Sequence, residues 1–273
     1  MKNNEIIYYP IIDDNNFIRP KIRQRTENVK VALGKSLMNI SLDINKANAF
    51  LVAGGDGFML DTMKKYYDFK KSPEENKLFL GVNCGTLGFL LNDVNQWGEL
   101  PKTTEEIDII KGYIMKVEIL KKDNQKEIKY AINDVVVGGN VLDYFKFFVN
   151  GPTTKEEFYG TGVMVSSALG STAYWLNNGG PMMSSGSDVR GISGIAALPF
   201  RPKGIRPEEI TIKIKGRSPA MVGVDGYQGR VDDIEELTIS PTAHYTSIAF
   251  LKDEHFNTKR MLLSQKKVLG EHI

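Results

Sequence analysis

The stretch Phe50–Leu60, "FLVAGGDGFML", joins two apolar runs through three glycines and a single carboxylate, Asp56. The first run is typical of a buried strand and the second of a helix. Glycines in such a turn let backbone N–H groups approach phosphate oxygens, and the helix N-terminus adds positive potential. A carboxylate held there can accept a proton from a hydroxyl or hold Mg²⁺. Because Asp-Gly is also common in plain turns, these residues alone leave both interpretations open.

The N-terminal part of the chain continues this alternation of strand and helix. Apolar runs at residues 5–12 and 77–83 predict strands, and residues 26–42 and 58–69 have the spacing of helices. Buried strands that alternate with helices are typical of a parallel sheet with both faces covered. We therefore predict an α/β N-terminal domain with a Rossmann-like parallel sheet.

The pattern changes between residues 93 and 105. Residues 112–120 and 126–137 predict two strands joined by a polar turn, and residues 208–216 alternate strictly between isoleucine and polar side chains. We predict a mostly antiparallel, β-sandwich-like C-terminal domain. The cationic, weakly helical end of the chain either packs back on the first domain or frays. The predicted division is residues 1–98, 99–250 and 251–273.

The composition is that of an ordinary globular chain, since 41% of the 273 residues are hydrophobic and 25% are charged. The net charge of +2 gives no reason to expect nucleic acid or a membrane surface as a partner. No apolar run is long enough to span a bilayer, and the first residues lack a signal-peptide core, so we expect a cytoplasmic protein. With one cysteine, Cys84, and three scattered histidines, neither a disulfide nor a zinc site is expected.

Further glycine-rich and polar segments follow the later strands. Residues 83–90, "NCGTLGFL", come directly after a buried strand, where ligands of open α/β folds bind. Residues 159–183 contain five glycines and the cluster "GSTAY", whose hydroxyls can form hydrogen bonds and whose tyrosine can stack on a base. The serine cluster lacks a His/Asp partner pattern, so a hydrolase triad is not predicted. The segments "IND" (132–134) and "VDG" (224–226) taken alone fit a turn or a strand end.

In this order, the motifs "GGDG", "NCGTLGFL", "IND", "GTG…GSTAY…NNGGP" and "VDG" resemble the NAD kinase family over residues 50–230. "GGDG" alone would also fit diacylglycerol, sphingosine and phosphofructo-kinases. The resemblance implies an α/β first domain, a β-sandwich-like second domain, and a final segment that returns to the first. It places the site in the crevice between the domains. It also implies self-association as a dimer or tetramer, in which a neighbouring subunit completes the site.

The resemblance assigns roles to individual residues. Asp56 is implied to act as general base at the 2′-hydroxyl of the adenosine ribose and to belong to the Mg–ATP site. Asn133 is expected to bind ribose hydroxyls beside Asp134, and Phe89 is expected to line the adenine pocket with Tyr174. The other positions implied to bind substrate or nucleotide are Gly55, Gly57, Thr161, Thr172, Ala173, Asn177 and Asp225.

The chain departs from the family pattern at several positions. Phe58 stands where the family has a threonine after GGDG, and Asp134 stands where it has a glutamate. Thr161 replaces an acid that contacts the second base of the dinucleotide, and Leu169 replaces a polar threonine. Residues 194–202, "GIAALPFRP", replace a histidine-containing stretch. The resemblance is therefore to a divergent member, matched better on the adenosine side than on the nicotinamide and phosphoryl-donor sides.

The implied activity is transfer of a phosphoryl group from ATP, another nucleoside triphosphate or polyphosphate to the 2′-hydroxyl of NAD, forming NADP. Mg²⁺ would be bound mainly through substrate phosphates, because the sequence offers no dedicated set of protein ligands. One alternative is a changed acceptor or donor, which the loss of an acid at Thr161 suggests. Another is a non-catalytic dinucleotide-binding sensor, since Phe58 and Leu169 both replace hydroxyls. A lipid kinase is less expected, because no apolar lipid-facing helix is present and "GSTAY" would be unexplained.

Overall fold

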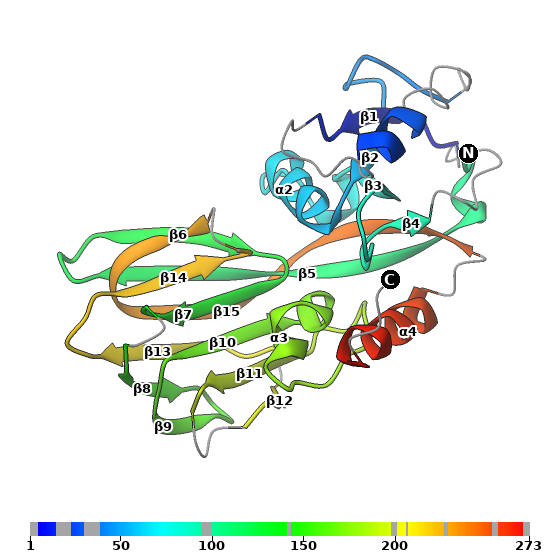
Figure 1. Ribbon diagram of the computed structural model, residues 1–273. Helices are drawn as coiled ribbons and strands as arrows, with labels where there is room; N and C mark the ends of the chain where they lie inside the picture. Colours follow the sequence, from blue (N-terminus) through cyan, green and yellow to red (C-terminus); the bar gives the residue numbers. More distant parts are fainter. Residues whose placement is uncertain are drawn as a thin grey trace. The chain divides into compact units, whose positions relative to one another are not determined.

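The chain forms two compact units. Unit 1 comprises Met1–Lys111 and Thr246–Ile273, and unit 2 comprises Gly112–Tyr245. Strands β5 (Ile107–Lys121) and β15 (Val231–Leu251) each begin in one unit and end in the other (Figure 1). The computed structural model describes residues 5–14, 23–29, 39–93, 100–140, 143–197, 201–205, 207–226, 229–252 and 256–269.

The predicted boundary at residue 98 lies outside the described residues, whereas the compact units divide at Lys111 and Tyr245. Both of these points lie inside continuous strands. Because a strand that passes between units carries no cluster of turn residues there, its sequence gives no boundary signal. The division into residues 1–98, 99–250 and 251–273 stays a prediction.

Unit 1 is built on a parallel sheet. Strands β1, β2 and β3 lie in that order, and the end of β15 pairs in parallel with β3. All six residues of β2 are buried, as its unbroken apolar sequence requires of a strand covered on both faces. The elements are β1 (Tyr8–Ile12), β2 (Ala49–Gly54), β3 (Leu78–Asn83), β4 (Asn92–Asp93), α2 (Asp56–Tyr66), α4 (Phe256–Leu269), η1 (Pro73–Glu75) and η3 (Thr104–Glu106).

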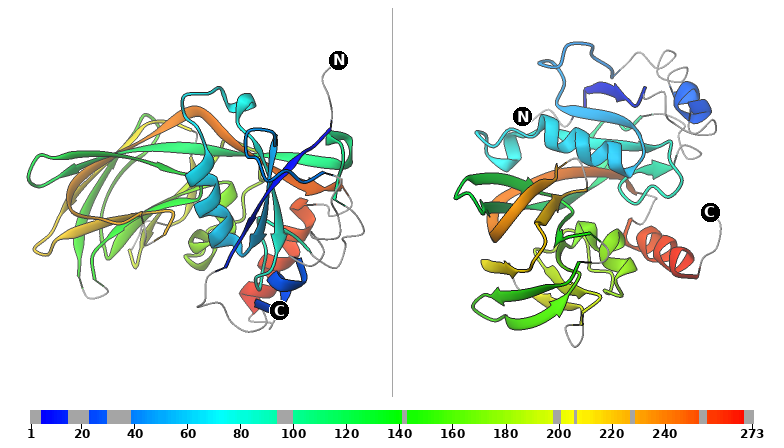
Figure 2. Two further views of the ribbon diagram at one scale, coloured as in Figure 1. Left: turned by 90° about the horizontal axis from the view of Figure 1, so that it is seen from above. Right: turned by 60° about the vertical axis from the view of Figure 1, so that its left-hand side comes forward.

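The helices of unit 1 cover this sheet. Helix α2 follows β2 after the glycine turn and buries Met59 and Met63, which lie one turn apart on one face. Helix α4 lies beside the strands of unit 1 (Figure 2), and its Lys259 ammonium donates a hydrogen bond to the Leu91 carbonyl. Among the described residues, no helix has the length and apolarity needed to cross a membrane.

Unit 2 is antiparallel throughout its described pairings. One path of strands runs β15–β14–β7–β10–β11–β12, and another leads from β15 through β13 and β8 to β9. Side chains from both paths, among them Phe147 of β8 and Val165 of β10, form one apolar core. The elements are β6 (Lys126–Ala131), β7 (Asp134–Gly138), β8 (Phe145–Asn150), β9 (Lys155–Gly160), β10 (Gly162–Ser167), β11 (Arg190–Ile195), β12 (Lys203–Ile205), β13 (Ile210–Lys215), β14 (Ala220–Val224), η4 (Leu169–Thr172) and α3 (Tyr174–Asn177).

The predicted fold class, an α/β part followed by a mostly antiparallel β part, is confirmed. The three isoleucines of β13 are buried while its lysines are exposed, as the alternation predicts.

The helix predicted over residues 26–42 is wrong at its end. Residues 23–29 are helical and residues 30–38 lie outside the described part, but Asn39 and Ile40 pair with Tyr8 of β1. This edge pairing overrides the helical spacing.

Candidate functional site

Asp56 is the first residue of α2, and both of its carboxylate oxygens are occupied. Oδ1 accepts a 2.8 Å hydrogen bond from the backbone N–H of Leu90, and Oδ2 accepts one of 3.1 Å from Phe89. These two donors belong to the predicted "NCGTLGFL" segment, which follows β3. The structure thus joins two of the predicted motifs at the carboxyl ends of neighbouring parallel strands.

The turn that holds Asp56 is itself fixed by Asn83, the last residue of β3. The Asn83 Oδ1 atom accepts a hydrogen bond from the Gly85 N–H at 2.9 Å. The Asn83 amide nitrogen donates to the Leu87 carbonyl at 3.4 Å and to Asp93 Oδ1 at 3.2 Å. Gly88 adopts a left-handed φ of 72°, and a side chain there would collide with the Asn83 amide. The glycine is therefore required by both its backbone angle and its space.

The two glycine turns of unit 1 approach each other closely. A Cβ at Gly85 would lie 3.2 Å from the Cα of Gly55, so only small residues fit at this contact. Gly55 also caps α2 without any side-chain hydrogen bond, and Gly57 is exposed with open space around it. The N–H groups of the first turn of α2 thus have no side-chain cap from Gly55.

Phe58, which stands where the resemblance predicts a threonine, has a packing role. Its ring lies over the end of β2, since a Cβ at Gly54 would be 2.6 Å from the Phe58 Cδ1 atom. The side chain is partly buried and covers the strand-to-helix turn. Cys84, beside this turn, is fully buried, and burial raises the pKa of its thiol, as expected for an unreactive cysteine.

The electrostatic surroundings of Asp56 include two cations of α4. Burial raises the pKa of Asp56 above its ordinary value, while hydrogen bonds from the turn and the charge of Lys259 oppose that rise. Arg260 is fully buried, and burial lowers its pKa to about 10, with the Asp56 carboxylate acting in the opposite direction. In the sequence, both cations belong to a cationic tail and carry no individual signal.

In unit 2, Asp225 fastens the segment that carries Asn133. Its carboxylate accepts backbone hydrogen bonds from Ile132 at 2.9 Å, Asn133 at 2.7 Å and Asp134 at 3.0 Å. In return, the Asp225 N–H donates to the Asp134 carbonyl at 2.9 Å. Asp225 has a left-handed φ of 51°, which brings its carboxylate onto this segment. These contacts make Asp225 an internal anchor, and the nucleotide-binding role that the resemblance gives it stays a prediction.

The Asn133 segment also meets the start of the "GSTAY" region. The Ser167 N–H donates to the Asn133 carbonyl at 2.8 Å, and the Ser167 hydroxyl donates to the Ile132 carbonyl at 2.6 Å. The Gly170 N–H donates to that same hydroxyl at 3.1 Å. The "VDG" motif and the "GSTAY" region therefore both meet the "IND" motif at residues 132–134, and Ser167 is a connecting residue to which the sequence analysis assigned no role.

Asp134 carries a buried carboxyl group beside Asp225. Burial and the neighbouring Asp225 charge together raise the pKa of Asp134 to about 7. Asp134 is the first residue of β7, and only 7% of the residue is exposed. The group therefore titrates near neutral pH.

The remaining predicted residues have different exposures. Thr172 is buried in η4, whereas Tyr174 is 41% exposed at the start of α3 and Asn177 is exposed at its end. Ala173 is partly buried between these elements. The Thr161 hydroxyl donates to the Ile195 carbonyl at 3.2 Å, so it is engaged within unit 2.

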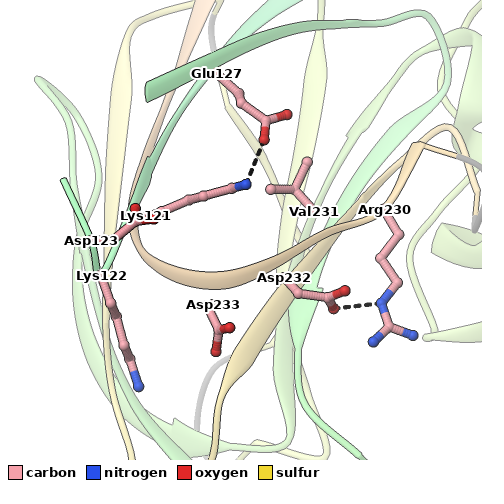
Figure 3. A pocket seen from close by; sticks show the side chains of 8 residues that line it. All are labelled: Lys121, Lys122, Asp123, Glu127, Arg230, Val231, Asp232 and Asp233. Atoms are coloured by element: carbon pink, nitrogen blue, oxygen red, sulfur yellow. Dashed lines mark hydrogen bonds and ion pairs between the residues drawn. The ribbon is translucent and has the colours of Figure 1, made fainter. Parts of the chain in front are cut away.

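A polar hollow of about 460 Å³ in unit 2 lies away from these residues. In Figure 3, the Lys121 ammonium pairs with Glu127 at 2.7 Å and Arg230 pairs with Asp232 at 2.5 Å. None of the predicted site residues lines this hollow. Its positive and negative side chains pair with each other, so its charge favours neither an anion nor a cation. The residues around it are Lys121, Lys122, Asp123, Glu127, Arg230, Val231, Asp232 and Asp233.

Comparison with known sequences identifies the family. The chain is 30% identical over 224 residues to an NAD kinase of Sulfurimonas denitrificans, covering 78% of the chain and 73% of that relative. The chain belongs to the NAD kinase family. No protein-family model matches this NAD kinase family member.

Solved structures agree with the fold of this NAD kinase family member. A crystal structure of yeast NADH kinase complexed with NADH has a TM-score of 0.71 at 18% identity, covering 98% of the chain and 88% of the yeast protein. An NAD kinase from Archaeoglobus fulgidus in complex with ATP has a TM-score of 0.67 at 18% identity, covering 95% and 99%. The predicted fold class and the predicted family are both confirmed.

Proposed function

We propose that this chain transfers the terminal phosphoryl group of a nucleoside triphosphate to the 2′-hydroxyl of the adenosine ribose of NAD, forming NADP. The relatives of this chain support the reaction, since they include an NAD kinase and an NADH kinase. The observation that carries the proposal on this chain is the Asp56 carboxylate, held by two backbone N–H groups at the N-terminus of α2.

Asp56 acts as the general base in this proposal. The ribose 2′-oxygen bonds to the γ-phosphorus, the bond to the β,γ-bridging oxygen breaks, and the hydroxyl proton passes to the carboxylate. Phe89 and Leu90 orient the carboxylate before substrate arrives, which lowers the entropic cost of the reaction. Burial raises the pKa of Asp56 and makes it a stronger base, while Lys259 favours the ionised form that a base needs.

The phosphates of the donor bind at the start of α2. Gly55 leaves the N–H groups of the first helical turn without a side-chain cap, and Gly57 puts no side chain in the way. A helix N-terminus of this kind favours anions. ATP is the proposed donor, which the ATP complex of the Archaeoglobus NAD kinase supports. Polyphosphate is the alternative donor.

The adenosine binds through the residues that the family resemblance assigns to it. Asn133 contacts ribose hydroxyls from a segment that Asp225 and Ser167 hold in place, and Asp134 lies beside it. The exposed ring of Tyr174 stacks on the adenine, since an aromatic ring left in solvent is suited to this contact. Phe89, Thr172, Ala173 and Asn177 are the other residues proposed to contact the adenosine.

Mg²⁺ fits this site as a cation carried by the donor phosphates. Among the described residues, no group of three or more His, Cys, Asp or Glu side chains lies together as a metal site. Asp56 is the carboxylate at the α2 N-terminus, and each of its oxygens retains a lone pair beyond its backbone hydrogen bond. Asp56 would thus supply the protein contact, and the ion would neutralise phosphate charge.

A second candidate activity differs in the molecule that accepts the phosphoryl group. Thr161 has no charge, and its hydroxyl is already bonded to the Ile195 carbonyl, so it cannot replace an acid at the second base of the dinucleotide. An altered preference between NAD, NADH and other adenosine compounds follows from that observation.

We also propose self-association as a dimer or tetramer and a cytoplasmic location, which light scattering and cell fractionation test.

An assay of NADP formation tests the proposal. Purified protein is supplied with NAD, Mg²⁺ and ATP, and omission of NAD serves as the control. The proposal expects NADP only in the complete mixture. NADH, other triphosphates and polyphosphate are assayed in parallel, and formation of no phosphorylated dinucleotide from any pair would contradict it and support a non-catalytic sensor.

A further inference from the structure

Lys259 of α4 is joined to the turn that follows β3. Its ammonium group donates to the Leu91 carbonyl at 2.9 Å and lies 3.2 Å from the Asp93 carboxylate. The Lys259 side chain is only 13% exposed, whereas Lys116 and Lys213, in ion pairs of unit 2, are 33% and 59% exposed. A carbonyl contact made by a largely buried ammonium is stronger than an exposed ion pair.

The same turn holds Asp56 from its other side. Phe89 and Leu90, directly before Leu91, donate the two backbone hydrogen bonds to the Asp56 carboxylate. Asp93, in β4 directly after this turn, also accepts a 3.2 Å hydrogen bond from the Asn83 amide, so both Lys259 and Asn83 anchor the chain there. A continuous set of contacts therefore leads from the C-terminal helix to the carboxylate.

The neighbouring residue on α4 provides a second, independent observation. Arg260 is fully buried and interacts electrostatically with Asp56. Burying a guanidinium is costly unless a compensating charge is present, and the Asp56 carboxylate is such a charge. Both cations of α4 therefore act electrostatically on the carboxylate.

We infer that α4 belongs to the machinery of the site, with Lys259 as a positioning residue that fixes the turn whose N–H groups orient Asp56. The expected effect on kcat rests on the proposed function, whereas the expected effect on the turn rests on geometry alone. The segment that continues from β15 thereby completes the cradle of the proposed base, although it lies some 200 positions away in the chain.

Lys259→Met tests the inference, because methionine keeps the apolar stem and removes the ammonium. We expect kcat to fall on the order of a hundredfold, as for a base misplaced by about 1 Å, with the KM for NAD little changed. Lys259→Arg, which keeps the charge and the donors, should restore most of the activity. The matched control is Gln265→Met, the same new residue at an exposed position of α4.

Hydrogen exchange of the Phe89 and Leu90 amides reports how firmly the turn is held, and this measurement does not depend on enzymatic activity. The inference expects faster exchange of these amides in Lys259→Met than in Gln265→Met. Asp93→Asn should show a smaller increase. This variant takes the place of Lys259→Met if Lys259→Met does not fold. Unchanged exchange together with unchanged kcat would overturn the inference. If the wild-type protein forms no NADP, the proposed function fails, while the exchange comparison still decides the role of Lys259.

Discussion

The carboxylate of Asp225 accepts a 2.7 Å hydrogen bond from the backbone N–H of Asn133, 92 positions earlier in the chain. With the bonds from Ile132 and Asp134, it satisfies three consecutive N–H groups. One carboxylate thus shapes the whole segment that carries the proposed ribose contact. Asn133 can hold a defined position only if these hydrogen bonds from Asp225 are intact.

Asp225→Ala should therefore destabilise unit 2 and loosen the Asn133 segment. Leaving partly buried N–H groups without a partner costs about 1–3 kcal/mol each, and solvent can satisfy some of them, so we expect a loss of about 3 kcal/mol. Urea unfolding measures this loss. Asp225→Asn, which keeps one acceptor oxygen and tolerates a left-handed φ, should lose less. Equal stability of Asp225→Ala and the wild type would contradict the anchoring role.

Asp134 should make the stability of the protein fall as the pH rises. Its pKa is raised from 3.8 to about 7 in the folded protein, so between these values the folded state keeps a proton that the unfolded state has lost. Stability is greatest below the unfolded pKa and declines through the folded one, by up to about 1.4 kcal/mol per pH unit. Urea midpoints at pH 5 and pH 8 measure the slope.

Asp134→Asn provides the control for that slope, because asparagine resembles the protonated carboxyl group and does not titrate. We expect the difference in midpoint between pH 5 and pH 8 to shrink in this variant. A slope identical to that of the wild type would mean that Asp134 does not titrate in this range.

Much of this arrangement can be predicted from the sequence. The buried run of β2, its glycine turn and the alternation in β13 each depend on local pattern, and Asp56 is marked by its place between glycines. The anchoring by Asp225 cannot be predicted this way, because a carboxylate bound to backbone N–H groups 92 positions away leaves no local signal. Lys259 is one of many cations in a charged tail, and only the fold singles it out.

Gly88→Ala should disturb the cradle of Asp56. Alanine at a φ of 72° costs about 1–2 kcal/mol, and its methyl group would also collide with the Asn83 amide. We expect a lower melting temperature and a kcat reduced by at least tenfold. Gly57→Ala, at a position with open space, is the control and should melt close to the wild type. An equal drop in melting temperature in both variants would show that the turn has no special geometry.

Phe58→Thr restores the residue that the family pattern predicts. The ring of Phe58 covers Gly54, so the smaller side chain should cost about 1–2 kcal/mol of unfolding free energy through lost apolar burial. Turnover should be retained within a few-fold, because Asp56 is held by Phe89 and Leu90 rather than by residue 58. Chemical denaturation and NADP assays measure the two effects. A gain in stability would contradict the packing role.

Turnover by Asp56→Asn tests the central claim most directly. Asparagine has nearly the same shape but cannot accept the hydroxyl proton, and loss of a general base costs 10²–10⁴-fold. We predict that kcat for NADP formation falls by at least about a hundredfold, while the affinity for NAD, measured by calorimetry, stays within a few-fold. Wild-type-like turnover in Asp56→Asn would contradict the assignment of Asp56 as the base.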